Sequence, residues 1–189
     1  MSKTIEIRWH GRGGQGAITA AKIVANAAFQ TGYDGIIMAP SFGTERRGAP
    51  ISTSLKIAKT KINDLSPIET PDIVVVLDHV LMEEGVTDGL KPGGLLVLNT
   101  PKDLECYPLD RFRVAVADVS SLSSEVGLRK GIVNSGIIGA LAKASGLIEL
   151  TVLLEQIKQE FQGRKPDENS KAAELTYQRT RIGGLNGAN

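Results

Sequence analysis

The chain has 189 residues, which is enough for one domain with its own core and too few for two comfortable ones. Hydrophobic residues make up 41% and charged residues 23%, as in ordinary globular proteins, so the composition excludes a disordered or fibrous chain. The formal net charge of +1 excludes the strong positive field that attracts nucleic acids or anionic membranes, and we expect neither as a partner.

The single cysteine, Cys106, limits the redox chemistry of the chain. An internal disulfide needs two cysteines and an iron–sulfur cluster needs several thiolates, so we expect no cluster and no metal site in this chain alone. No apolar run approaches the roughly 20 residues that cross a bilayer, and no signal-like segment opens the sequence. We therefore expect a cytoplasmic protein.

The N-terminal part begins with an alternating pattern. Ile5, Ile7 and Trp9 alternate with polar residues, which predicts a strand over residues 4–9. After the stretch "GRGGQG", polar residues recur at spacings of three and four, which predicts a helix ending near Gly32. A short strand follows over residues 35–39. The stretch "ISTSLKI" then predicts a half-exposed strand, with residues 59–63 as its possible hairpin partner.

Strands and helices alternate in the remainder of the chain. Continuous apolar runs over residues 72–78, 93–99 and 112–118 predict strands covered on both faces. Helices are predicted over residues 80–89, 120–128, 135–145, 149–161 and 166–179. The fold class is therefore α/β, a three-layer α/β/α unit with a mostly parallel sheet and a C-terminal helical extension. We assign residues 1–162 to the α/β domain and residues 163–189 to a polar C-terminal helix and tail, with "IGGLNGAN" mobile or ordered by a partner.

The glycine-rich stretch follows a strand and precedes a helix, an arrangement in which backbone N–H groups and the helix dipole hold anions. Gly11, Gly13 and Gly16 also match the dinucleotide fingerprint G-x-G-x-x-G. That fingerprint requires an acid at the carboxyl end of the second strand, whereas Asp34 precedes this strand. The pattern thus disfavours a self-sufficient dinucleotide or methyl-donor site and leaves open a plain tight turn.

A second unusual stretch, "SFGTERRGAP", follows the second strand. Its Glu45, Arg46 and Arg47 would lie at the same sheet edge as the glycines, where ligands of open α/β sheets gather. Arginine presents a planar fork of donors that suits phosphate or carboxylate, although a solvated charged turn remains the alternative. No catalytic residue can be assigned. Asp78, Asn99 and Asp118 can each be an ordinary cap or turn residue at a strand end, and spacing assigns no nucleophile or orienting partner to His79 as a base.

The motifs "EIRWHGRGGQGAITAAKI", "SFGTERRGAPI", "PDIVVVLD" and "GGLLVLNT" occur in this order over about residues 4–161. Together they resemble the gamma subunit of 2-oxoacid:ferredoxin oxidoreductases, most closely the pyruvate synthase (pyruvate:ferredoxin oxidoreductase) type. Family members that act on 2-oxoglutarate, branched-chain or aryl 2-oxoacids share these motifs, so the resemblance leaves the substrate open.

The resemblance implies a non-autonomous subunit. Such complexes oxidatively decarboxylate a 2-oxoacid with coenzyme A to an acyl-CoA, carbon dioxide and reduced ferredoxin or NADH. Alpha, beta and delta subunits would be the partners, and the complex would carry thiamine diphosphate, Mg²⁺ and [4Fe-4S] clusters that this chain alone does not bind. The gamma unit would pack beside the thiamine-bearing subunits, on the coenzyme A side of the active site.

Our site hypothesis combines the residues with the resemblance. An anion-receptive edge would be formed by Gly11, Arg12, Gly13, Gly14, Gln15, Gly16, Arg46 and Arg47, with Glu45 holding one arginine in place. This edge would face coenzyme A or a neighbouring subunit. Two alternatives remain open: a free-standing nucleotide-binding α/β protein, and a purely architectural subunit whose glycine loop contacts only protein.

Overall fold

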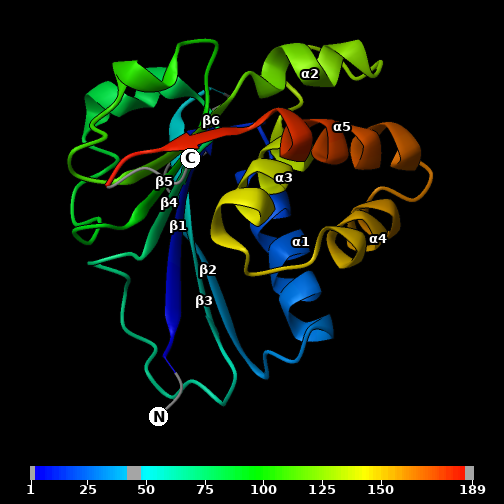
Figure 1. Cartoon of the computed structure of the whole chain (residues 1–189). Helices are drawn as coiled ribbons and strands as arrows, with labels where there is room; N and C mark the ends of the chain where they lie inside the picture. The colour runs from blue at the N-terminus through cyan, green and yellow to red at the C-terminus, as the bar shows by residue number, and fades with distance from the viewer. Residues whose placement is uncertain (1–2, 42–47, 186–189) are drawn as a thin grey trace.

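A computed structural model describes residues 3–41 and 48–185, which form a seven-stranded sheet with helices (Figure 1). The strands are β1 (Ile5–Arg12), β2 (Gly35–Ser41), β3 (Pro50–Ala58), β4 (Ile73–Val76), β5 (Leu95–Asn99), β6 (Arg113–Ala117) and β7 (Arg181–Gly183), in the spatial order β2-β3-β1-β4-β5-β6-β7. The chain is thus an α/β protein, as predicted.

The sheet is mixed. Strands β1, β4, β5 and β6 pair in parallel, whereas β3 pairs antiparallel with both β1 and β2, and β7 antiparallel with β6. The prediction that β3 forms a hairpin with residues 59–63 was wrong, because those residues form no strand and β3 lies inside the sheet. The serines of β3 alternate with buried residues because one face of this part of the sheet is only thinly covered.

The helices divide unequally between the two faces of the sheet. The α-helices are α1 (Ala17–Gln30), α2 (Val119–Glu125), α3 (Asn134–Ser145), α4 (Leu150–Glu160) and α5 (Pro166–Arg179), and the 3₁₀-helices are η1 (His79–Glu84) and η2 (Leu104–Cys106). Figure 1 shows α1, α3, α4 and α5 together on one side of the sheet, with α4 and α5 outermost. The helix predicted over residues 80–89 is only the short η1, because Gly85 takes a left-handed conformation that ends it.

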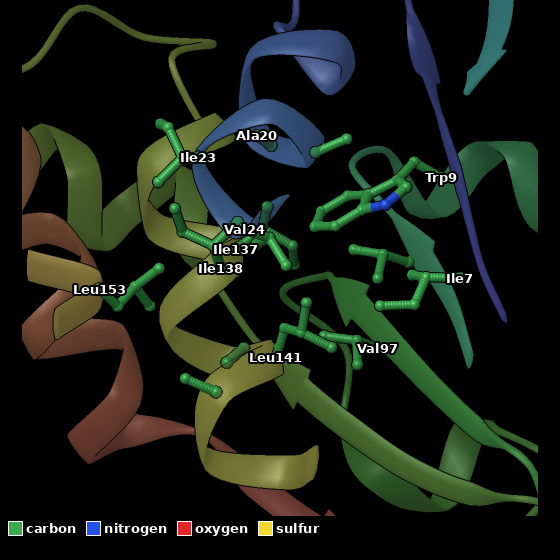
Figure 2. Packing of buried hydrophobic residues seen from close by; sticks show 14 of the residues in the cluster. Ile7, Trp9, Ala20, Ile23, Val24, Val97, Ile137, Ile138, Leu141 and Leu153 are labelled. Atoms are coloured by element: carbon green, nitrogen blue, oxygen red, sulfur yellow. The ribbon is translucent and has the colours of Figure 1, made fainter. Parts of the chain in front are cut away.

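The main core lies between the sheet and the α-helices (Figure 2). Trp9 of β1 packs toward Val24 of α1 and Ile137 of α3, and all three are essentially inaccessible to solvent. Each such side chain contributes about 1.5–3 kcal/mol by its removal from water. A second cluster fills the opposite face, where Val74, Leu96 and Val114 meet Leu81 of η1. Strands β4, β5 and β6 are therefore covered on both faces, as their continuous apolar runs predict.

The segment after residue 162 joins the same unit. Helix α5 lies so close to α3 that a Cβ added at Gly139 would be 2.0 Å from the carbonyl oxygen of Ala173. Lys143 donates hydrogen bonds to the carbonyls of Gln178 and Thr180, just before β7. The expectation that "IGGLNGAN" is mobile or ordered by a partner was wrong for Ile182 and Gly183, because β7 pairs with β6 of the same chain. No helix in the described part of the chain is long and apolar enough to span a bilayer.

Candidate functional site

The glycine loop joins β1 to α1 at the carboxyl edge of the sheet. The strand predicted to end at Trp9 continues through Gly11 and Arg12, because both residues still pair with β3. The loop proper turns through Gly14 and Gly16, whose φ angles of 95° and 79° favour glycine. Helix α1 begins directly afterwards, with no side-chain cap on its first N–H groups.

The loop is partly closed by its own hydrogen bonds. The Arg12 N–H donates to Oε1 of Gln15 (2.7 Å), and the Gln15 N–H donates to the carbonyl of Arg12 (2.9 Å). Within the described residues, the N–H groups of Gly14 and Gly16 make no hydrogen bond. The donors available to an anion are therefore these two groups and the first turn of α1, fewer than the motif alone suggests.

The loop lies beside the end of the second sequence motif. The N–H of Gly13 donates to the carbonyl of Ala49 (2.8 Å), and the N–H of Gly48 donates to the carbonyl of Gly13 (3.1 Å). The two stretches are thus neighbours at one edge. Glu45, Arg46 and Arg47 lie outside the described residues, so their part in the site stays a prediction.

The side chain of Arg12 is held in place by two groups. Its Nε donates to Oδ2 of Asp78 at the end of β4 (2.8 Å), and its Nη1 donates to the carbonyl of Gly48 (3.3 Å). Asp78 also caps η1, because its Oδ1 accepts from the N–H of Val80 (3.1 Å). The cap role of Asp78 is as predicted. The pairing with Arg12 was missed, although β1 and β4 are adjacent parallel strands whose ends meet.

A cleft of about 380 Å³ opens beside Gln15 of the loop, over the ends of β4, β5 and β6. Its lining includes the polar residues Gln15, Asp78, Asn99, Asp118 and Ser120. The Asn99 Nδ2 donates to the carbonyl of Leu77 (2.8 Å) and to Oγ of Ser120 (3.2 Å), so the amide is fixed in orientation.

Two further helix ends border this edge. Asp118 caps α2 by accepting from the N–H and Oγ of Ser121 (3.0 and 2.6 Å). The start of α3 approaches the loop, since a Cβ added at Gly16 would lie 2.6 Å from Nδ2 of Asn134. This convergence of helix N-termini at the carboxyl edge suits a ligand that accepts hydrogen bonds.

The histidines lie in different places. His79 lines the carboxyl-edge cleft. His10 lines a separate cleft. Burial, together with the nearby Arg8 cation, lowers the pKa of His10 to about 4. In residues 3–41 and 48–185, no group of three or more His, Cys, Asp or Glu side chains is placed to hold a metal ion.

Comparisons with known proteins agree with this architecture. The family model described as pyruvate ferredoxin/flavodoxin oxidoreductase matches residues 6–179. The pyruvate/ketoisovalerate oxidoreductases common subunit gamma of Thermococcus kodakarensis is 44% identical over 93% of this chain and 97% of that one. Pyruvate synthase subunit PorC of Methanocaldococcus jannaschii is 42% identical over 92% of this chain and 95% of that one.

Solved structures show the same fold. The pyruvate oxidoreductase subunit PORC of Thermotoga maritima superposes with a TM-score of 0.82 at 32% identity, over 95% of this chain and 98% of that one. A 2-oxoglutarate:ferredoxin oxidoreductase from Magnetococcus marinus contains the fold as 30% of a longer chain, with a TM-score of 0.72, 21% identity and coverage of 94% of this chain. The protein therefore belongs to the pyruvate ferredoxin/flavodoxin oxidoreductase family, as the gamma subunit of a 2-oxoacid oxidoreductase complex.

Proposed function

We propose that this subunit helps to form the coenzyme A side of the active site of its complex, in the cytoplasm. The assembled enzyme would oxidatively decarboxylate a 2-oxoacid with coenzyme A to an acyl-CoA and carbon dioxide, and would pass electrons to ferredoxin or NAD. The chain would pack beside thiamine-bearing alpha and beta subunits, with a cluster-bearing delta subunit, and would be inactive by itself.

The observation that carries this proposal is the placement of Arg12. The guanidinium is held by Asp78, which lines the carboxyl-edge cleft, and by the carbonyl of Gly48. Gly14 and Gly16, whose N–H groups make no hydrogen bond within the described residues, follow in the same loop. The Arg12 Nη2 has no hydrogen bond within the described residues. A guanidinium and backbone donors at one edge suit a phosphate of coenzyme A, while the carboxylates and hydroxyls of the cleft suit the neutral hydroxyl and amide groups of the same molecule.

The other cofactors would be held by other subunits. Iron–sulfur clusters need several thiolates, whereas this chain has only Cys106, which is exposed. The residues present therefore do not fit a cluster, and no step of electron transfer is assigned to them. The name of the Thermococcus relative describes a gamma subunit common to pyruvate and ketoisovalerate oxidoreductases, which supports selection of the 2-oxoacid by other chains.

The test is kinetic and uses the assembled enzyme. Arg12→Ala, Arg46→Ala and Arg47→Ala are each expected to raise the KM for coenzyme A about tenfold while leaving the KM for the 2-oxoacid unchanged, because each removes a charged donor to one ligand. Arg181→Ala is the matched control, since Arg181 pairs with exposed Asp103 and lies on β7, which three strands separate from β1. Unchanged coenzyme A kinetics in all three variants would contradict the proposal.

A second candidate function is purely architectural, and the internal hydrogen bonds of the loop favour it. The N–H groups of Arg12, Gly13 and Gln15 are already satisfied within the chain. In that case loop variants would lower the yield of assembled complex, and the complex that does form would have normal coenzyme A kinetics. The same set of variants therefore separates the two functions.

A further inference from the structure

A second cleft, of about 360 Å³, lies on the face of the sheet opposite the α-helices. It is bordered by β1, β3 and the residues around the end of η1, and Arg8, His10, Ser52 and Glu84 line it. Side chains alternate across a strand, and Ile7 and Trp9 enter the helical core (Figure 2). Arg8 and His10 therefore point to the other face.

Within the described residues Arg8 forms no ion pair, although the carboxylates of Glu84 and Asp88 line the same cleft. Its Nε donates to Nε2 of His10 (3.0 Å), and its Nη2 donates to the carbonyls of Val86 (3.1 Å) and Asp88. Burial lowers the pKa of Arg8, and the Asp88 charge opposes this effect. Lys56 on the neighbouring strand, in contrast, pairs with two carboxylates. A partly buried guanidinium bound only by neutral groups favours an incoming anion.

Two further donors lie beside it. His10 is neutral at physiological pH, and because its Nε2 accepts from Arg8, its proton is on Nδ1. Ser52 lies directly opposite His10 in the β1–β3 register. Within the described residues, neither His10 Nδ1 nor Ser52 Oγ makes a hydrogen bond. The strands thus present a cation and two donors. Glu84 and Asp88 also line the cleft, and because both are exposed, water and salt screen the repulsion between their charges and an anion.

The surroundings suit a protein surface more than a small anion. Ile37 and Ala39 of the edge strand β2 are cross-strand neighbours of Lys56 and Ser54, and neither is buried. Since Ser54 lies opposite Arg8, these apolar side chains continue the same face to the sheet edge. Half-buried Ile37 and exposed Ala39 thus add a small apolar area beside the three donors, and subunit interfaces combine apolar contacts with hydrogen bonds in this way.

We propose that the Arg8–His10–Ser52 cleft docks an aspartate or glutamate side chain of another subunit of the oxidoreductase complex. The carboxylate would accept from the guanidinium of Arg8 and from His10 Nδ1 and Ser52 Oγ, which neutralises the charge. The inference rests on membership of a multi-subunit complex and is independent of the coenzyme A role, because the cleft lies on the opposite face from the α1 core and its test does not use coenzyme A.

The first test is site-specific photo-crosslinking in the assembled complex. Benzoylphenylalanine replaces Ser52 in one variant and the rim residue Glu84 in another, so that one position remains informative if the other blocks assembly. Lys171, exposed on the outer helix α5, is the matched control position. We expect cross-links from the two cleft positions to an acidic segment of a different subunit, mapped by mass spectrometry, and none from Lys171. Cross-links to a second copy of this chain, or from Lys171 alone, would overturn the proposal.

The second test concerns charge. Arg8→Gln is expected to weaken binding of the isolated chain to the remaining purified subunits by about tenfold or more, with a reduced dependence on salt. Arg179→Gln, on exposed α5, is the control and should bind normally. Circular dichroism confirms that both variants fold. Equal affinities for the two folded variants would refute the role of Arg8.

Discussion

Arg12 and Asp78 form an ion pair, with 2.8 Å between Nε and Oδ2, that joins the carboxyl ends of β1 and β4. The two side chains are 30% and 20% exposed, so the pair lies at the cleft mouth rather than in the core. The second oxygen of Asp78 caps η1. One carboxylate therefore holds both a charged donor and a helix end at the candidate site.

Asp78→Asn should separate these two roles. The amide oxygen can still cap η1, but the negative charge that orients Arg12 is lost. We expect the KM for coenzyme A to rise several-fold in the assembled enzyme, with a loss of unfolding free energy below about 1 kcal/mol, because partly exposed ion pairs stabilise little. Steady-state kinetics and urea unfolding measure the two effects. Asp103→Asn breaks the exposed pair with Arg181 and should change neither. An unaffected KM in Asp78→Asn would show that Arg12 needs no such anchor.

The two left-handed glycines of the loop should respond differently to alanine. At Gly16 a Cβ would lie 2.6–3.0 Å from the Asn134 side chain, in addition to the strained φ, whereas at Gly14 it would meet nothing within 4 Å. We expect Gly16→Ala to lower the unfolding free energy by about 2–3 kcal/mol and Gly14→Ala by about 1 kcal/mol. Denaturant unfolding of the isolated chain checks this. Equal losses would mean that Asn134 moves away without cost.

Lys56 should be important for stability. Its side chain is 4% exposed and lies 3.3 Å from Glu6 and 3.0 Å from Asp64. Burial lowers the pKa of Lys56, but the hydrogen bonds that it donates to Asp64 and Glu6 outweigh burial and raise the pKa, so the residue stays charged. Lys56→Ala should cost about 3 kcal/mol of unfolding free energy, because it leaves Glu6 without its buried partner.

Lys91 provides the matched comparison for Lys56. It also pairs with Glu6, and with Asp72, but its side chain is 39% exposed. Lys91→Ala should therefore cost less than about 1 kcal/mol. Similar losses in the two variants, measured by urea unfolding at neutral pH, would contradict the argument that burial decides the contribution of Lys56.

His10 should make stability depend on pH. Its folded pKa of about 4 lies below the ordinary value of 6.5, so between these values the unfolded chain binds more protons. The contribution of His10 is therefore fully present above pH 6.5 and is lost as the pH falls toward 4, by on the order of 2 kcal/mol. His10→Asn, whose amide oxygen can still accept from Arg8, removes this dependence. The unfolding free energy should therefore fall less between pH 7.5 and pH 4.5 in the variant than in the unchanged protein. Equal declines in the two proteins would show that a group other than His10 causes the pH dependence.

Much of the fold could be predicted because the local pattern of apolar and polar residues indicates which side chains are buried. The continuous apolar runs of β4, β5 and β6 predict strands covered on both faces, and the spacing of polar residues along α1 predicts its exposed stripe. The partner of β3 could not be predicted in this way. Its alternating pattern shows that one face is covered, but not which strands flank it, since pairing is decided by contacts distant in sequence.

The candidate site was likewise predictable only in part. The sequence by itself determined the family, the strand–glycine–helix order and the edge at which the loop lies, because these follow from motif order and the direction of consecutive elements. Only the tertiary structure decided that Arg12 pairs with Asp78, that loop N–H groups are partly satisfied internally, and that Arg8 forms no ion pair within the described residues. Hydrogen bonds and ion pairs form only between groups a few ångströms apart. These outcomes therefore depend on which side chains are brought together by strands that are far apart in the sequence.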